Sequence, residues 1–260
     1  MGKSLARYWR VIGTGISFVL FGAGGLVLGF VILRVLHLLG RTDRQRVMWS
    51  REAIRLSFRF FIGVMNGLGV LRYSCTGLER LERRGLLILA NHPSLIDAVF
   101  LMAFVRNADC VVDAPLGLNP FTQGGIRMAS YIRNDLGGLP MVEACIASLE
   151  TGGNLVFFPE GMRTTPGCPI RLMRGGAQVA VRGARDVTPV IIRCVPPTLT
   201  RGEKWWRVPP RRAQFTIEVH EDIAVRPFLE HDGAPPLAAR ALNAYLQQYF
   251  TRESQSHASA

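Results

Sequence analysis

The chain has 260 residues, of which 48% are hydrophobic, and it carries a formal net charge of +12. This length suffices for one sizeable domain with an additional segment. The five cysteines are scattered without a C-x-x-C pair, which argues against a disulfide framework or a zinc site and favours a reducing, cytoplasmic setting. We expect each of them to be a small core residue and not a reactive thiol.

The positive charge is concentrated in the N-terminal part of the chain. Residues 1–60 contain ten lysines and arginines but only two acidic residues, a net charge of +8 that leaves +4 for the other 200 residues. Because no nucleic-acid-binding motif accompanies this charge, we expect a membrane surface as the partner and not nucleic acid.

An uncharged stretch of 23 residues runs from Val11 to Leu33. As a helix it would be about 35 Å long, enough to cross a bilayer core of about 30 Å, so it predicts a membrane-embedded segment. Gly24 and Gly25 offer a point at which the helix could break and return to the same leaflet. Spanning and re-entrant forms are therefore both open.

Residues 41–71 predict a basic amphipathic helix. Such a helix can lie among anionic lipid headgroups, with arginines such as Arg51 and Arg55 supplying the positive charge. The alternative is a helix that packs against the rest of the protein and exposes one solvated face. Either arrangement keeps the following domain close to the membrane.

Short apolar strands alternate with helices between residues 72 and 250. We expect strands at 85–90, 110–112, 131–132, 154–158, 187–195 and 214–220, and helices at 93–105, 141–150, 174–183 and 237–250. This alternation predicts an α/β fold, a single catalytic domain over 72–250 with a largely parallel sheet flanked by helices, preceded by the membrane-associated helical segment 1–71. The polar residues 251–260 are expected to form a disordered tail.

The first motif that suggests chemistry is Asn-His-Pro-Ser-Leu-Ile-Asp at 91–97. Histidine accepts a proton near neutral pH, so His92 is a candidate general base. If a helix begins near Pro93, Asp97 lies about one turn inside it and can reach back to orient the imidazole. A His-x4-Asp spacing alone is a weak signal and is more often structural.

The second motif is Phe-Pro-Glu-Gly-Met-Arg-Thr at 158–164, directly after an apolar strand. Ligands bind at the carboxyl ends of strands in open α/β sheets. Arg163 can hold a phosphate or carboxylate with two hydrogen bonds, and Glu160 can orient a hydroxyl or Arg163. Since no Ser or Cys lies in a nucleophile elbow and no metal-ligand cluster is evident, the two motifs predict direct transfer of an acyl group to a hydroxyl, without a metal or bound cofactor.

These motifs resemble those of the glycerophospholipid acyltransferases typified by lysophosphatidate acyltransferase, whose blocks read N-H-x4-D and F-P-E-G-T-R-S. Val187-Thr188-Pro189-Val190 is similar to a later V-x-P-V element of that family, so the resemblance covers roughly residues 70–220. The resemblance implies that His92 is the base and Asp97 its partner. It also implies that Glu160, Gly161 and Arg163 bind the acceptor.

The resemblance further implies the substrates and the location. The donor would be acyl-CoA or acyl carrier protein, used as a co-substrate, and the acceptor a lysophospholipid such as 1-acyl-glycerol-3-phosphate. The enzyme would lie in the bacterial inner membrane, in contact with membrane lipids, with its catalytic domain on the cytoplasmic side. The positively charged flanks of the apolar stretch agree with a membrane location.

The chain departs from the family at two places. Met162 stands where the family has threonine, and residues 125–135 carry Arg133 without a clean match to the family's phosphate-binding arginine. Arg174, after the second motif, could meet phosphate or face solvent. The acceptor could thus be another lipid, a glycan or a carrier-tethered intermediate, and a catalytically silent lipid-binding protein is a further alternative. The pair Trp205-Trp206, flanked by Lys204 and Arg207, suits either a membrane interface or a packed loop.

Overall fold

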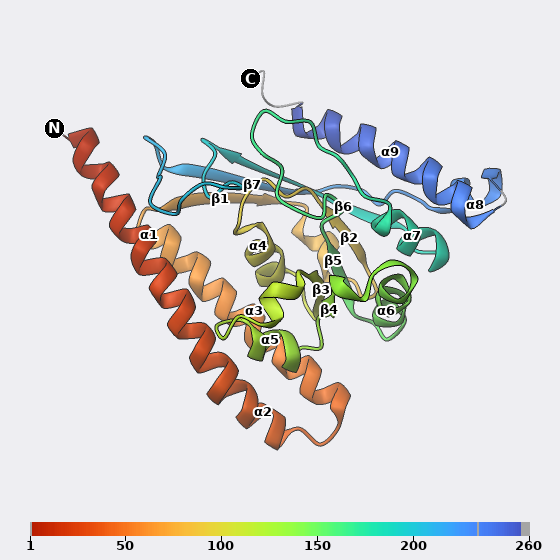
Figure 1. Cartoon of the computed structure of the whole chain (residues 1–260), viewed down its shortest axis with the longest axis horizontal. Coiled ribbons are helices and arrows are strands. Elements are labelled where there is room, and N and C mark those ends of the chain that lie inside the picture. Colours follow the sequence, from red (N-terminus) through yellow and green to blue (C-terminus); the bar gives the residue numbers. More distant parts are fainter. Residues whose placement is uncertain (1, 233, 256–260) are drawn as a thin grey trace.

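Figure 1 shows the computed structural model, which describes residues 2–232 and 234–255. A seven-stranded sheet lies at its centre, with the strand order β1-β7-β6-β2-β5-β3-β4. The strands are β1 (Leu71–Thr76), β2 (Leu87–Ala90), β3 (Ala108–Val112), β4 (Ile132–Arg133), β5 (Asn154–Phe157), β6 (Val187–Val195) and β7 (Ala213–Val219). All neighbouring strands are parallel except β6 and β7, which confirms the α/β fold with a largely parallel sheet.

Helices precede the sheet and connect its strands. The N-terminal helices are α1 (Gly2–Val27), the π-helical η1 (Leu28–Ile32), α2 (Leu33–Leu39) and α3 (Asp43–Gly67). The later helices are α4 (Asp97–Phe104), α5 (Gln123–Met128), α6 (Gly138–Glu150), α7 (Gly175–Arg182), α8 (Arg226–Asp232) and α9 (Pro235–Gln255), with short 3-10 helices η2 (Leu78–Glu82), η3 (Ala114–Gly117) and η4 (Asn134–Leu136). Figure 1 shows α1 and α2 as one long rod along one side of the molecule, with α9 on the opposite side.

The central strands are apolar on both faces because helices cover both. In β2, Ile88 and Ala90 belong to the core cluster that includes residues of α3 and α4, whereas Leu87 and Leu89 belong to the cluster that includes residues of α6, α7 and α9. Successive side chains of a strand point to opposite faces, so a strand buried on both faces is apolar throughout. This explains why Gly85–Ala90 lacks an alternating polar pattern.

The N-terminal rod is continuous, and the break considered at Gly24 and Gly25 does not occur. Gly25 instead permits close packing, because a Cβ atom there would lie 2.3 Å from the carbonyl oxygen of Phe121, in the loop before α5. The helical run Leu5–Leu39 is long and apolar enough to cross a membrane, judged by length and composition alone, and only 22% of its most apolar window is buried.

Helix α3 packs on the sheet domain, as the alternative interpretation of residues 41–71 predicted. Its residues Ile62 and Met65 lie in the same core cluster as the sheet. Arg51 is buried and bonds Asp109 of β3 at 2.6 Å, and Arg55 is buried and bonds Glu52. The prediction that these two arginines face lipid headgroups is therefore wrong, since their charges are neutralised within the protein.

Three smaller expectations also differ from the structure. The helix expected from Pro93 begins at Asp97, because residues 91–96 form a loop tied to neighbouring segments by hydrogen bonds. Helix α9 extends through Gln255, so the expected tail is helical over 251–255, and residues 256–260 lie outside the described residues. The cysteines are unpaired, and Cys168 is exposed although all five were expected in the core.

Candidate active site

The two motifs meet at the carboxyl edge of the sheet. β2 and β5 are neighbouring parallel strands, and each motif begins as its strand ends, so their loops emerge side by side. Asn91 closes β2 with its side chain, which donates to the carbonyl of Ile192 at 2.8 Å and accepts from the Ile192 amide at 2.7 Å. The Asn91 side chain thus takes the place of a backbone hydrogen-bond partner for β6, and the main chain turns away from the sheet at His92.

His92 and Asp97 form a hydrogen-bonded pair. The distance between His92 Nδ1 and Asp97 Oδ2 is 2.9 Å, and Asp97 Oδ2 also accepts from the Ser94 amide at 2.6 Å. Asp97 is fully buried, while His92 is partly exposed and stacks on the Phe158 ring with centroids 4.3 Å apart. The pair therefore joins a fixed inner carboxylate to an imidazole that opens to the surface.

The buried carboxylate determines the histidine tautomer. Burial raises the pKa of Asp97 above its ordinary value, and the hydrogen bonds from His92 and Ser94 oppose this rise. The Asp97 carboxylate can accept a hydrogen bond from His92 Nδ1 only if that nitrogen carries the proton. Nε2 then has a free lone pair and is available to accept a proton from a bound hydroxyl.

Glu160 fastens the two motif loops together. Its Oε1 accepts from the His92 amide at 2.8 Å, and its other oxygen is bonded by the Thr164 hydroxyl. A backbone hydrogen bond from Thr164 to the His92 carbonyl, 3.0 Å long, adds a direct link. Burial raises the pKa of Glu160 to about 7, although the His92 amide opposes the shift. Both carboxylate oxygens of Glu160 thus bind groups of the two motif loops and stabilise their arrangement.

Arg163 is partly buried beside the pair. Its Nη1 donates to the carbonyls of Leu199 and Thr200 at 3.0 and 3.3 Å. Its positive charge adds to the effects that oppose the rise in the pKa of Asp97. Gly161 precedes it with a φ of +70°, a left-handed conformation that glycine adopts without strain. Within residues 2–232 and 234–255, Nε and Nη2 of Arg163 have no recorded partner, so they can bind an anion.

The structure brings five of the predicted site residues together: His92, Asp97, Glu160, Gly161 and Arg163. It does not bring Arg133 or Arg174 into contact with them. Arg133 lies on β4, three strands from β2 and hence roughly 14 Å across the sheet, and it is paired with Asp135. Arg174 is exposed at the N-terminus of α7.

Three further residues shape the site, and the sequence alone does not assign them a role there. Ser94 supplies the amide that binds Asp97 and a hydroxyl that donates to the Thr198 carbonyl at 3.1 Å. Phe158 supplies the ring beneath His92, and Thr164 bonds Glu160. All three lie inside the two motifs, and this position was the only indication in the sequence that they belong to the site. Their partners in the structure could not be inferred from the motifs.

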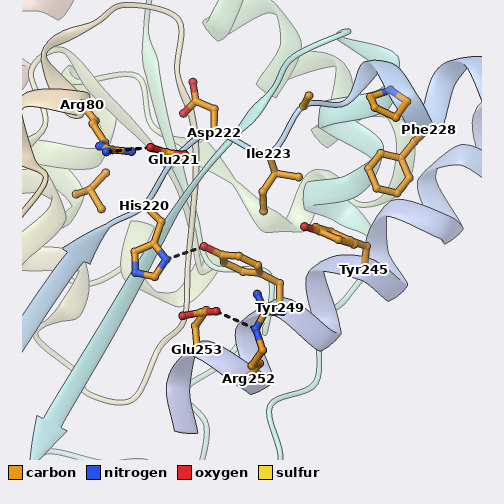
Figure 2. Close-up of a pocket in the computed structure, with 13 residues that line it drawn as sticks. Arg80, His220, Glu221, Asp222, Ile223, Phe228, Tyr245, Tyr249, Arg252 and Glu253 are labelled. Carbon is orange, nitrogen blue, oxygen red and sulfur yellow. Dashed lines mark hydrogen bonds and ion pairs between the residues drawn. The ribbon is translucent and has the colours of Figure 1, made fainter. Parts of the chain in front are cut away.

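A separate cavity of about 830 Å³ lies between the end of β7, η2 and α9, and none of its lining residues belongs to the motifs. Figure 2 shows that its polar groups face one another. Arg80 lies 3.5 Å from Glu221, and His220 Nδ1 lies 2.6 Å from the hydroxyl of Tyr249, whose pKa burial raises to about 12. The first contact joins η2 to the segment after β7, and the second joins α9 to the same segment, so we assign this cavity a structural role.

Comparisons with known proteins agree with the fold and the motifs. A family model described as Acyltransferase matches residues 72–193, the segment that holds both motifs. A 1-acyl-sn-glycerol-3-phosphate acyltransferase from Pseudomonas aeruginosa is 25% identical over 242 residues, which is 90% of this chain and 87% of the relative.

A solved structure extends the agreement to the N-terminal helices. The 1-acyl-sn-glycerophosphate acyltransferase PlsC from Thermotoga maritima has the same fold, with a TM-score of 0.73, 18% sequence identity, and coverage of 99% of this chain and 98% of its own. With both motifs in place on this fold, the chain is an acyltransferase that resembles the lysophosphatidate acyltransferases.

Proposed function

We propose that this enzyme transfers a fatty acyl group from a thioester to the free hydroxyl of a lysophospholipid-like acceptor, with 1-acyl-glycerol-3-phosphate as the acceptor. The observation that carries the proposal is the 2.9 Å pair of His92 Nδ1 and Asp97, which leaves Nε2 to accept a proton beside Arg163. The Pseudomonas aeruginosa and Thermotoga maritima relatives, both described as acting on this lipid, support the choice of acceptor.

The proposed reaction needs one base and no covalent enzyme intermediate. Nε2 of His92 takes the proton of the acceptor hydroxyl as its oxygen bonds to the thioester carbonyl carbon. The buried Asp97 stabilises the imidazolium that forms. When the tetrahedral intermediate collapses, the carbon–sulfur bond breaks and the thiolate takes the proton from Nε2. The products are an ester and a free thiol.

Arg163 is the proposed anchor for the acceptor phosphate. Guanidinium groups bind phosphate through two parallel hydrogen bonds, and Nη1 is already fixed by two carbonyls, so the remaining donors have a set direction. We assign Glu160 to positioning instead of substrate contact, since both its oxygens bind the motif loops. Gly161 would contribute its backbone to the acceptor site, since a Cβ atom there would lie 2.6 Å from Met173 Sδ and its φ of +70° also favours glycine. Arg133 and Arg174 remain candidates for more distant parts of the donor.

The donor is proposed to be acyl-CoA or acyl carrier protein, and the contacts at His92 suit either. Both carry the acyl group as a thioester of the same phosphopantetheine arm, so the chemistry at the carbonyl is identical. Comparing the two donors in one assay distinguishes them.

We further propose that the enzyme lies on the inner membrane with α1 in the plane of the membrane surface. Many large apolar side chains of α1, η1 and α2 are exposed, including Leu5, Ile12, Val19, Phe30 and Leu38. The opposite side of the rod contacts the sheet domain from Arg10 to Leu33, about 35 Å of helix. A spanning helix would draw those polar loops into the hydrocarbon, whereas an in-plane helix leaves them in water.

The test is an assay of thioester loss by the detergent-solubilised protein with lysophosphatidate, using acyl-CoA or acyl carrier protein, beside His92→Ala. We expect turnover that falls by at least about 1,000-fold in the variant, because the base is removed. Turnover with another acceptor only would keep the mechanism and exclude the proposed lipid. Turnover that does not depend on His92 would exclude the mechanism, and a complete lack of transfer would favour a lipid-binding scaffold.

A further inference from the structure

The segment between β6 and β7 is densely basic. Residues 201–212, here called the basic loop, contain five basic side chains and a single acidic one, Glu203. Four of the basic residues are exposed: Arg201, Lys204, Arg207 and Arg211. Among the residues that the structure describes, none of these four forms an ion pair, so their charges are available to an external anion.

Two tryptophans lie among these charges. Trp205 is 41% exposed and Trp206 is 49% exposed, with their rings packed edge to face. The Lys204 ammonium lies 5.2 Å from the centre of the Trp206 ring. Large exposed aromatic rings are costly in water, but at a membrane surface their apolar bodies and polar N–H groups both find suitable surroundings.

The basic loop is fixed against α1 (Figure 1). The Trp205 and Phe18 rings have centroids 6.1 Å apart, and the buried Arg10 donates to the Pro210 carbonyl at 2.8 Å. On α1, the side chains of Ile12 and Ile16 are also exposed. Exposed aromatic and basic groups therefore continue the apolar surface of the helix.

The start of the basic loop also borders the active site. The carbonyls of Leu199 and Thr200, directly before it, accept hydrogen bonds from Arg163, and the carbonyl of Thr198 accepts one from Ser94. Whatever the loop rests on must consequently lie close to the place where the acceptor binds.

We propose that the basic loop is a second membrane-binding element, which holds anionic phospholipid headgroups through Arg201, Lys204, Arg207 and Arg211 while Trp205 and Trp206 enter the interface. This inference rests on the membrane association proposed above. A lipid surface fits better than an acidic protein, because the charges are interleaved with exposed tryptophan and continue an apolar helix surface. The loop sets the opening of the active site at the level of the headgroups, where a lysophospholipid hydroxyl resides.

The first test measures the depth of the two tryptophans. The chain has four tryptophans, so the full-length variant W9F/W49F leaves Trp205 and Trp206 as the fluorescent probes. The protein is diluted from detergent into vesicles of phosphatidylcholine and phosphatidylglycerol with brominated acyl chains. We expect a blue-shifted emission that the bromine quenches. Emission that stays at its wavelength in water and is not quenched overturns the proposal.

The second test removes the charges. The variant R201Q/K204Q/R207Q/R211Q is compared with R84Q/R106Q/R182Q/R240Q, which removes four exposed arginines from other parts of the surface. Binding is measured on pure phosphatidylcholine vesicles and on vesicles with about 30% phosphatidylglycerol. Each basic residue near such a surface strengthens binding roughly fivefold, so the first variant should lose at least about tenfold of the phosphatidylglycerol-dependent binding. The control should stay within about twofold.

Each alternative outcome is decisive. Unchanged dependence on phosphatidylglycerol in the first variant overturns the proposal. Retained lipid binding together with lost binding to acyl carrier protein would instead identify the loop as a docking site for an acidic protein. Thioester turnover in detergent micelles should be normal in this variant, since none of its four side chains contacts the catalytic pair. Lipid binding and catalysis are thus measured separately, and either proposal can fail without the other.

Discussion

His92 is held on three sides, which leaves one nitrogen free. Its amide is bonded by Glu160, its Nδ1 by Asp97, and its ring face lies on Phe158. Catalytic power of such a pair depends on the tautomer as much as on distance. For the proposed catalysis, it is therefore more important that the side chain at position 97 accepts a hydrogen bond than that it has a particular volume.

Substituting Asp97→Asn should test this dependence on the tautomer. The asparagine amide can donate to Nδ1, which would place the proton on Nε2 and remove the base. We expect kcat to fall by about 10²–10⁴-fold with a much smaller change in KM. Steady-state thioester release measures both constants, and a thermal unfolding curve checks that the variant is folded. A kcat within tenfold of the wild type would contradict the assigned role.

Glu160 should make stability fall as pH rises. Its pKa is about 7 in the folded protein and near 4.5 in the unfolded chain, so the folded state binds the extra proton between these values. Stability from this group is thus present below pH 4.5 and lost as pH rises through 7. Glu160→Gln removes the effect. We expect the variant to be more stable than the wild type at pH 8, by roughly 3 kcal/mol, and to keep under about 1 kcal/mol of this advantage near pH 5.

Unfolding midpoints of both proteins between pH 5 and pH 8 measure that difference. A constant offset between the two proteins across this range would show that Glu160 does not titrate there.

At the scale of elements, the long N-terminal helix is shaped by where its glycines lie. Gly24 is exposed and a Cβ atom there would meet nothing within 4 Å, whereas the same atom on Gly25 would collide with the backbone of Phe121. The two neighbours thus have opposite roles. One only reduces helix propensity, and the other permits contact with the loop before α5.

Alanine at each position separates these roles. Gly25→Ala should destabilise the protein by about 1–3 kcal/mol, because a backbone atom must move. Gly24→Ala should be neutral or stabilising by up to about 1 kcal/mol, since alanine favours the helix. Thermal unfolding in the same detergent compares them. Equal effects of the two substitutions would mean that α1 does not contact this loop as described.

At the scale of the whole molecule, the N-terminal helices and the sheet fold as one body. Arg51 of α3 donates to Asp109 of β3 at 2.6 Å, to Asn107 and to the carbonyl of Ala129, and its side chain is 8% exposed. Burial raises the pKa of Asp109, and the Arg51 charge opposes this rise. The pair fixes the orientation of α3, which carries α1 and α2 with it.

Removing one partner of this pair should be costly. Arg51→Ala leaves Asp109 buried without its cation, and we expect a loss of about 3–5 kcal/mol of unfolding free energy. Arg44→Ala on the same helix is the control, because the Arg44 side chain is exposed, and should cost under about 1 kcal/mol. Denaturant unfolding measures both. A similar small loss for both variants would indicate that α3 is only loosely attached to the sheet.

The sequence by itself determined the α/β class and the presence of a long apolar N-terminal helix, and it contains the proposed base and its partner within one motif. These follow from local order: strands read as apolar runs, and both motifs are continuous stretches beside strand ends. The sequence also predicts the contact between Asp97 and His92, although it predicts a helix for the residues between them, where the structure has a loop. A first helical turn and a hydrogen-bonded loop can both bring residues 92 and 97 together, so the sequence pattern alone could not distinguish them.

Only the tertiary structure decided which charges are used where. Arg51 and Arg55 read as lipid-facing residues but are buried against Asp109 and Glu52, and Glu160 holds the His92 loop. A sequence records that a side chain is charged, but the free energy of that charge depends on partners brought together from distant segments. The basic loop joins the antiparallel strands β6 and β7, and its position against α1 likewise depends on a contact between segments 200 residues apart.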